Sequence, residues 1–133
     1  MSENCIFCKI IKKEIPSYII YEDKDTFAFL DIAPVNIGHT LVIPKKHYKI
    51  MTDTPDNLVS AVFVISKKLM KTIQKATKAD FIAVAVVGLD VPHFHVHLVP
   101  RFFNDGMANF WPTKKYKENE ATEIANKIKS LLK

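Results

Sequence analysis

The stretch His93-Phe94-His95-Val96-His97-Leu98-Val99 carries three of the chain's five histidines, at every second position. In a β-strand successive side chains point to opposite faces, so this spacing places the three imidazoles in one row. Phe94, Val96 and Leu98 then form an apolar row on the other face, where a hydrophobic core is expected. Imidazole can act near pH 7 as a nucleophile, a proton carrier, a hydrogen-bond donor to an anion or a metal ligand. The pattern therefore predicts a strand whose polar face is a functional site.

The alternative is a half-buried strand whose polar face is merely rich in histidine. A single histidine favours this alternative, because histidine has only an intermediate tendency to be buried. Three histidines in strict alternation, in a chain that has five, favour a site instead.

The length and composition describe one folded unit. With 133 residues, 48% of them apolar, the chain is predicted to form a single domain over residues 1–133. No run of 18 apolar residues occurs, so no membrane segment is expected. The N-terminal stretch MSENCIFCKIIKKEIP lacks the apolar region of a signal peptide, which predicts a cytoplasmic protein.

The formal net charge of +5 mildly favours anionic partners such as nucleotides. Five of the lysines fall within one predicted helix, between residues 67 and 78, where they are typical of a solvated face. The sequence has no aromatic-basic RNA-binding motif and no helix-turn-helix spacing, so no specific nucleic-acid binding is expected.

Cys5 and Cys8 form a C-x-x-C motif near the N-terminus. In a cytosolic chain such a pair indicates metal binding or redox chemistry rather than a structural disulfide. A thioredoxin-like redox motif would follow a strand, and no strand is expected in residues 1–4, which come before this motif in the sequence. Two cysteines provide half of a tetrahedral zinc site, for which His47 and His93 are the candidate remaining ligands. Two small buried thiols without a metal are the alternative.

The order of elements indicates an α+β fold with a five-stranded antiparallel sheet, one long helix and short terminal helices. Thr54 is predicted to cap the long helix, with Pro55 at its first position and an apolar stripe that ends at Ile73. The almost wholly apolar stretch Phe81–Val87 is predicted to be a central strand covered on both faces. Strands are expected over 17–22, 26–31, 39–44, 81–87 and 93–99, and helices over 5–13 and 120–132, with the long helix beginning at Pro55 and including Ile73 and Lys78.

Three motifs in order give the chain a resemblance to a known family. CIFCKIIKKEIPSYIIYEDKDTFAFLDIAP, GHTLVIPKKH and HFHVHLVPR resemble the histidine-triad (HIT) nucleotide hydrolases and transferases. The similarity is greatest to the branch of small nucleoside phosphoramidases, the protein kinase C inhibitor-like proteins. The resemblance implies a HIT-like α+β domain that pairs into a homodimer through a continuous sheet. It also implies a nucleotide substrate, a conjugate of AMP or GMP.

The resemblance also implies catalytic roles. His95 matches the family nucleophile, which attacks the α-phosphorus and forms a nucleotidyl-histidine intermediate that water then hydrolyses. His97 and His39 match the positions that stabilise the charge developing on the phosphoryl oxygens.

Further positions match the family's nucleotide-binding residues. Asp31 matches the acidic residue that holds the ribose hydroxyls, although on the sequence alone it fits turn initiation before Pro34 about equally well. The resemblance implies an apolar wall around the base, which consists of Phe7, Ile10, Ile15, Phe29 and Ile32. By composition alone these five are core residues.

In the zinc-binding members of the family, the ligands are a C-x-x-C pair, a histidine after the GHT strand and the first triad histidine. Cys5, Cys8, His47 and His93 occupy these positions here. A closed site of four ligands implies structural Zn²⁺.

The sequence departs from the family just before the triad. Leu89 and Asp90 replace the Gln and Ser/Thr that contact the phosphate and the leaving group. Asp90 is a candidate general acid if its pKa is raised. The preferred hypothesis is that it orients a histidine.

The preferred function is hydrolysis of a nucleoside 5′-phosphoramidate or related nucleotide conjugate. Alternatives are a dinucleoside polyphosphate hydrolase and a zinc-stabilised nucleotide-binding module with little turnover. A catalytic metal on the histidine row is a further alternative. Whether Trp111 reaches a partner's site stays open.

Overall fold

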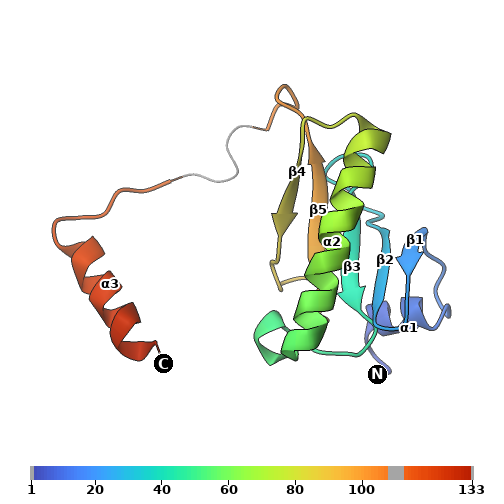
Figure 1. Cartoon of the computed structure of the whole chain (residues 1–133), viewed down its shortest axis with the longest axis horizontal. Coiled ribbons are helices and arrows are strands. Elements are labelled where there is room, and N and C mark those ends of the chain that lie inside the picture. Colours follow the sequence, from blue (N-terminus) through green and yellow to red (C-terminus); the bar gives the residue numbers. More distant parts are fainter. Residues whose placement is uncertain (1, 108–112, 133) are drawn as a thin grey trace.

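The computed structural model describes residues 2–107 and 113–132, so Trp111 lies outside the described residues. Five strands form one antiparallel sheet in the order β1-β2-β3-β5-β4 (Figure 1). The α+β architecture and the five-stranded sheet expected from the sequence are thus confirmed. The elements are α1 (Ile6–Ile11), β1 (Ile19–Glu22), β2 (Thr26–Leu30), β3 (Thr40–Pro44), a short 3₁₀ turn (Met51–Asp53), α2 (Asp56–Thr77), β4 (Phe81–Ala85), β5 (Val96–Arg101) and α3 (Glu120–Leu131).

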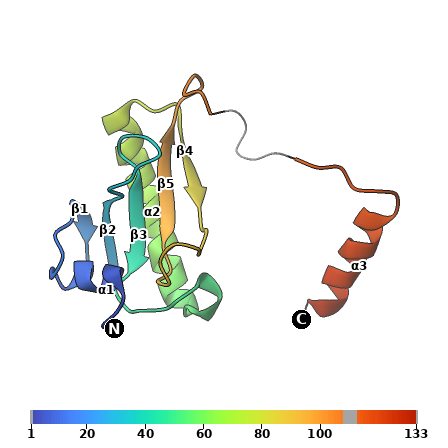
Figure 2. The same ribbon diagram turned by 180° about the vertical axis from the view of Figure 1, so that it is seen from behind.

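The sheet separates two apolar clusters. The long helix α2 covers one face, and the short helix α1 packs on the opposite face near β2 (Figures 1 and 2). Strand alternation assigns side chains to the two clusters. The α2 cluster includes Ala28, Val42, Phe94, Val96 and Leu98, and the α1 cluster includes Phe7, Phe27, Phe29, Leu41 and Ile43. The apolar row of the histidine stretch therefore faces α2, as predicted.

Strand β5 begins later than the sequence predicts, at Val96 rather than His93. The backbone before it bonds outside the sheet: the Phe94 N–H donates to the Tyr48 carbonyl at 2.7 Å. His97 is paired with Leu41 of β3, which places its ring on the α1 face. Because the strand starts late, the backbone carbonyl of His93 is available for a partner outside the sheet.

The prediction that Phe81–Val87 is a central strand covered on both faces is wrong. Strand β4 ends at Ala85 and lies at the edge of the sheet, paired only with β5 among the described strands. Val84, Val86 and Val87 keep 43%, 41% and 53% of their surface exposed. Apolar composition alone cannot distinguish a central strand from an edge strand whose apolar side chains are covered by another surface.

The start of α2 also differs from the prediction. The helix begins at Asp56, and the Thr54 hydroxyl donates to the Ile50 carbonyl at 2.9 Å instead of capping the helix. The predicted apolar stripe is confirmed: Leu58, Val62, Leu69 and Ile73 are buried, and Ile65 packs against them. No helix within the described residues is both long and apolar enough to cross a membrane.

Candidate active site and metal centre

A cavity of about 230 Å³ opens between α1, the ends of β2 and β3, and the histidine stretch. All of the residues predicted to bind the nucleotide line it, together with two of the predicted catalytic histidines. These residues are Phe7, Ile10, Ile15, Phe29, Asp31, Ile32, Asp90, His95 and His97. His39 is not part of the lining and lies behind His97, 4% exposed. The structure therefore brings together residues that the sequence placed in three separate motifs.

His95 is held in one tautomer by a backbone group. Its Nδ1 lies 2.7 Å from the His93 carbonyl oxygen. Because a carbonyl only accepts, Nδ1 carries a proton, and in the neutral ring the lone pair is then on Nε2. The ring is 4% exposed and makes an edge contact with the Phe7 ring, whose centroid is 5.2 Å away. This arrangement presents an imidazole that is ready to act as a nucleophile.

A second backbone group sets the tautomers of His39 and His97. The Val35 N–H donates to Nδ1 of His39 at 3.1 Å, so the proton of neutral His39 is on Nε2. That Nε2 lies 3.0 Å from Nδ1 of His97 and donates to it. The proton of His97 is then on its own Nε2. We call the series Val35 N–H, His39 and His97 the histidine relay.

The relay ends in an atom with no partner. Nε2 of His97 is buried and makes no hydrogen bond within the described part of the chain. A buried donor without a partner costs about 1–3 kcal/mol. An anionic oxygen bound in the cavity that His97 lines would satisfy this donor.

Burial keeps the relay neutral. It lowers the pKa of His39 below the usual 6.5, and the charge of Asp31 only partly opposes this shift. Burial likewise lowers the pKa of His97, with a smaller lowering from His95 and His39. The negative charges of Asp31 and Asp90 act on His97 in the opposite direction and are minor causes.

Asp31 serves the local turn and also lines the cavity. One carboxylate oxygen accepts the Ala33 N–H at 2.9 Å, which is the turn role that the sequence left open. The other lies 3.7 Å from Nε2 of His39. The carboxylate retains unused lone pairs that can accept hydrogen bonds from a ligand.

Leu89 and Asp90 occupy different environments. Leu89 is 84% exposed and is not part of the cavity lining, whereas Asp90 is part of it. Among the described residues no hydrogen bond joins Asp90 to a histidine, so the predicted orienting role has no support in this geometry.

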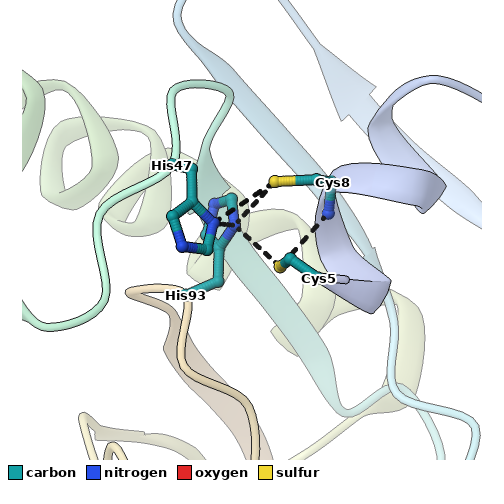
Figure 3. Close-up of side chains that lie close together, drawn as sticks. All are labelled: Cys5, Cys8, His47 and His93. Atoms are coloured by element: carbon teal, nitrogen blue, oxygen red, sulfur yellow. Dashed lines mark hydrogen bonds between the residues drawn. The ribbon is translucent and has the colours of Figure 1, made fainter. Parts of the chain in front are cut away.

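Cys5, Cys8, His47 and His93 converge beside α1 (Figure 3). His93 Nδ1 lies 3.4 Å from Cys5 Sγ, 3.6 Å from Cys8 Sγ and 3.2 Å from His47 Nδ1. Cys8 Sγ lies 3.3 Å from His47 Nδ1. Ligand atoms around a tetrahedral Zn²⁺ lie about 3.3–3.8 Å apart when Zn–S is about 2.3 Å and Zn–N about 2.0–2.1 Å. The four donors therefore fit a zinc ion.

The protonation of His93 agrees with a ligand role. Its Nε2 lies 2.8 Å from the Pro44 carbonyl and donates to it, so Nδ1 presents its lone pair to the two sulfurs. Burial lowers the pKa of His93 to about 4 and raises the pKa of the Cys8 thiol. The imidazole is therefore neutral at pH 7, as metal ligation requires.

Asp31, His39 and His97 also bring a carboxylate and two ring nitrogens within 4.8 Å of one another. A metal on Nε2 of His39 would require the proton of the neutral ring on Nδ1. The Val35 N–H already points at that nitrogen. The backbone therefore favours the hydrogen-bonded relay over a catalytic metal at these three residues.

Sequence reasoning named all four residues of the cysteine and histidine cluster and nine of the residues that line the cavity. It missed other lining residues, such as Leu41 and Val91, and the groups that set the protons. These groups are the Val35 amide and the carbonyls of Pro44 and His93. Every residue type has the same backbone groups, so the sequence does not show which of them bind a histidine. These hydrogen bonds follow from the late start of β5 and from the loop before His39, which only the structure shows.

The comparisons with known proteins agree with the fold. Residues 12–104 match the HIT domain, and the chain belongs to the HIT family. It is 41% identical over 117 residues to adenosine 5′-monophosphoramidase HNT1 of Saccharomyces cerevisiae, covering 84% of this chain and 72% of that one.

Two solved structures extend the comparison. A HIT family protein from Bacillus subtilis matches with a TM-score of 0.87 and 37% identity, covering 98% of this chain and 99% of the other. A zinc-bound histidine triad family protein from Mycobacterium smegmatis matches with a TM-score of 0.75 and 30% identity, covering 96% of this chain and 97% of that one.

Proposed function

We propose that this protein hydrolyses a nucleoside 5′-phosphoramidate, or a related nucleotide conjugate, at the α-phosphate. The observation that carries the proposal is the tautomer of His95: its Nδ1–H is committed to the His93 carbonyl, and its Nε2 lone pair is free. The ring lines a cavity of a size suited to part of a small ligand. The similarity to a yeast adenosine 5′-monophosphoramidase supports this substrate class.

The cavity provides contacts for each part of a nucleotide. Its apolar wall, which includes Phe7 and Phe29, suits the faces of a purine base. The Asp31 carboxylate has free lone pairs for the ribose hydroxyls. With the base and the ribose in these positions, the α-phosphate would lie next to His95 and His97.

In the first step Nε2 of His95 attacks the α-phosphorus, and the P–N bond to the leaving amine breaks. In the second step water attacks the nucleotidyl-histidine and the P–Nε2 bond breaks, which restores neutral His95. In the first step the amine leaves as the neutral molecule from a substrate that is protonated on this nitrogen. In the second step water gives its hydroxyl to phosphorus and releases one proton, which replaces the proton that left with the amine. Nε2–H of His97 donates to a phosphoryl oxygen, where negative charge develops.

His39 acts through His97 in this mechanism. Its Nε2–H is directed at His97 rather than into the cavity, and His39 does not line the cavity. We therefore assign His39 as a positioning residue, which refines the expectation that it donates to the phosphate directly.

Structural zinc at Cys5, Cys8, His47 and His93 would fix the N-terminal C-x-x-C motif to the backbone that precedes β5. The N-terminus of α1 carries Phe7, which contacts both His93 and His95, so this attachment also holds one wall of the cavity. The zinc-bound neighbour from Mycobacterium smegmatis supports the assignment.

Pairing into a homodimer is part of the proposal. Strand β4 presents an edge with half-exposed valines, which suits the continuous sheet that the family resemblance implies. The proposal also keeps two expectations from the sequence, a single domain and a cytoplasmic location.

The test is intact-protein mass spectrometry after rapid quenching of the enzyme with adenosine 5′-phosphoramidate, on wild type and His95→Ala. We expect wild type alone to gain one adenylyl group and to release AMP. AMP release by His95→Ala at the wild-type rate would exclude His95 as nucleophile. Absence of both adduct and AMP, with adenosine nucleotide still bound, would favour the alternative of a zinc-stabilised binding module.

A further inference from the structure

Asp90 brings a second carboxylate into the cavity that His95 and His97 line. Its side chain is exposed and makes no hydrogen bond or ion pair with any residue that the structure describes. Asp31 differs, because one of its oxygens accepts the Ala33 N–H at 2.9 Å. Both oxygens of Asp90 can therefore accept hydrogen bonds from a bound ligand.

A short turn holds Asp90 near the histidines. The His93 N–H donates to the Val91 carbonyl at 2.8 Å, which closes a three-residue γ-turn across Pro92. Proline fixes its own φ close to the value that the common form of this turn requires. The negative charge of Asp90 also acts on His97, so the carboxylate lies close to the ring that is assigned to donate to a phosphoryl oxygen.

The depth of two side chains in the cavity indicates which part of a substrate Asp90 meets. In an in-line displacement at phosphorus the attacking atom and the leaving atom lie on opposite sides. His95, the proposed nucleophile, is 4% exposed, whereas Asp90 is an exposed residue. A leaving group that departs away from His95 therefore moves toward the solvent side of the cavity, where Asp90 lies.

The charges of the cavity favour one kind of leaving group. Two carboxylates, and no lysine or arginine, are among the described residues that line it. A phosphoramidate that is protonated on its nitrogen has a positive charge at the leaving atom and N–H groups that can donate to a carboxylate. A phosphate or sulfate leaving group has no N–H and adds negative charge, which a nearby carboxylate repels.

We propose that Asp90 is a catalytic residue for P–N cleavage: its carboxylate accepts a hydrogen bond from the protonated leaving nitrogen and disfavours anionic leaving groups. The inference rests on the proposed function and names the bond that the site selects. Asp90 accepts the hydrogen bond without taking the proton. The electrons of the P–N bond pass to nitrogen, the amine leaves as the neutral molecule, and the carboxylate is unchanged.

A cation beside a neighbouring cavity makes the opposite preference the alternative. Lys49 lines a second cavity of about 200 Å³, which shares only His95 with the first. A leaving group in that second cavity would meet a positive charge and would be favoured when it is anionic. The two placements therefore predict opposite effects of the charge on the leaving group.

The test measures kcat/KM of wild type, Asp90→Asn and Asp25→Asn on adenosine 5′-phosphoramidate and on adenosine 5′-phosphosulfate. Asp25→Asn is the matched control, because it makes the same exchange in a cavity that shares no residue with this one. In Asp90→Asn we expect kcat/KM for the phosphoramidate to fall at least tenfold, whereas that for the phosphosulfate stays the same or rises. Asp25→Asn should match wild type on both substrates.

Calorimetry of AMP binding checks the nucleotide contacts, and the affinity of Asp90→Asn should be no lower than that of wild type. An AMP affinity that falls as far as kcat/KM, or a ratio of the two kcat/KM values that stays at the wild-type value in Asp90→Asn, would overturn the inference. A change of this ratio in Lys49→Gln alone would place the leaving group in the second cavity and would overturn it as well.

These failures are distinct from failure of the proposed function. Adenylyl transfer to His95 in wild type, with the ratio unchanged in Asp90→Asn, would leave the proposed function intact and remove only the role of Asp90. A wild-type protein that does not cleave the phosphoramidate would overturn both.

Discussion

Nε2 of His39 lies 3.0 Å from Nδ1 of His97, and the Val35 N–H fixes which of these two atoms carries the proton. One amide group thus sets the tautomers of two imidazoles. Because of these tautomers, His97 presents an N–H, rather than a lone pair, to a bound anion.

The first prediction concerns the protonation of these two rings. Long-range ¹H–¹⁵N NMR at pH 7 should find His39 and His97 neutral, each with its proton on Nε2. Because burial lowers both pKa values, both rings should titrate with midpoints below 6.5. A His97 ring with its proton on Nδ1 would contradict the relay.

The same shifts fix the pH dependence of stability. Unfolded histidines take up protons near pH 6.5, whereas folded His39 and His97 do so only at lower pH. The unfolded state therefore binds more protons below pH 6.5, and these groups lower the free energy of unfolding as pH falls. Above pH 6.5 both states are neutral, and the contribution of these groups should be flat in urea unfolding measured across pH.

The second prediction tests His39 as a positioning residue. His39→Phe removes the donor to Nδ1 of His97 and should lower kcat by roughly 10²-fold, with a smaller change in KM. His39→Gln, whose amide can both accept and donate, should recover part of the loss. The tautomer of His97 should become mixed in His39→Phe by the same NMR measurement. A fall in kcat with the His97 tautomer unchanged would show that His39 does not act through His97.

The third prediction concerns the four-donor cluster. Cys5→Ser with Cys8→Ser should abolish bound zinc, measured by elemental analysis, and lower the unfolding midpoint by ~10 °C. His95→Ala serves as control, since it alters the neighbouring ring that is not a ligand, and should retain one zinc per chain. Zinc content that stays at the wild-type level in the double variant would exclude these ligands.

The fourth prediction isolates the packing at Gly38, the residue before His39. Its φ is +97°, and an added Cβ would lie 2.7 Å from Thr77 Cγ2. That methyl cannot rotate away without loss of the hydrogen bond from the Thr77 hydroxyl to the Ile73 carbonyl, at 2.8 Å. Gly38→Ala should lower the free energy of unfolding by about 1–3 kcal/mol more than Gly88→Ala.

Gly88 is a matched control because its φ is +78° and nothing lies within 4 Å of an added Cβ. Both variants carry the backbone strain of a positive φ, and only Gly38→Ala adds the contact. Equal losses in chemical denaturation would mean that Thr77 moves freely.

The sequence predicts the side chains of the site well and the boundaries of the elements less well. Period-2 alternation identifies the apolar row that faces the core, and the C-x-x-C motif with two of the histidines identifies the four residues that the structure brings together. Two predictions are wrong for different reasons: the edge position of Phe81–Ala85 depends on the order of strands in the sheet, and the hydroxyl of Thr54 donates to a competing backbone acceptor, the Ile50 carbonyl. Local propensity contains neither.

His93 occupies both sites at once: its ring belongs to the cysteine cluster, and its carbonyl holds the Nδ1 proton of His95. The two groups belong to one residue, so a backbone shift at His93 would alter both the four-donor cluster and the hydrogen bond to His95. If zinc occupies the cluster, its loss would release the ring of His93, and through the His93 carbonyl that loss would reach the tautomer of His95 without any contact between metal and substrate.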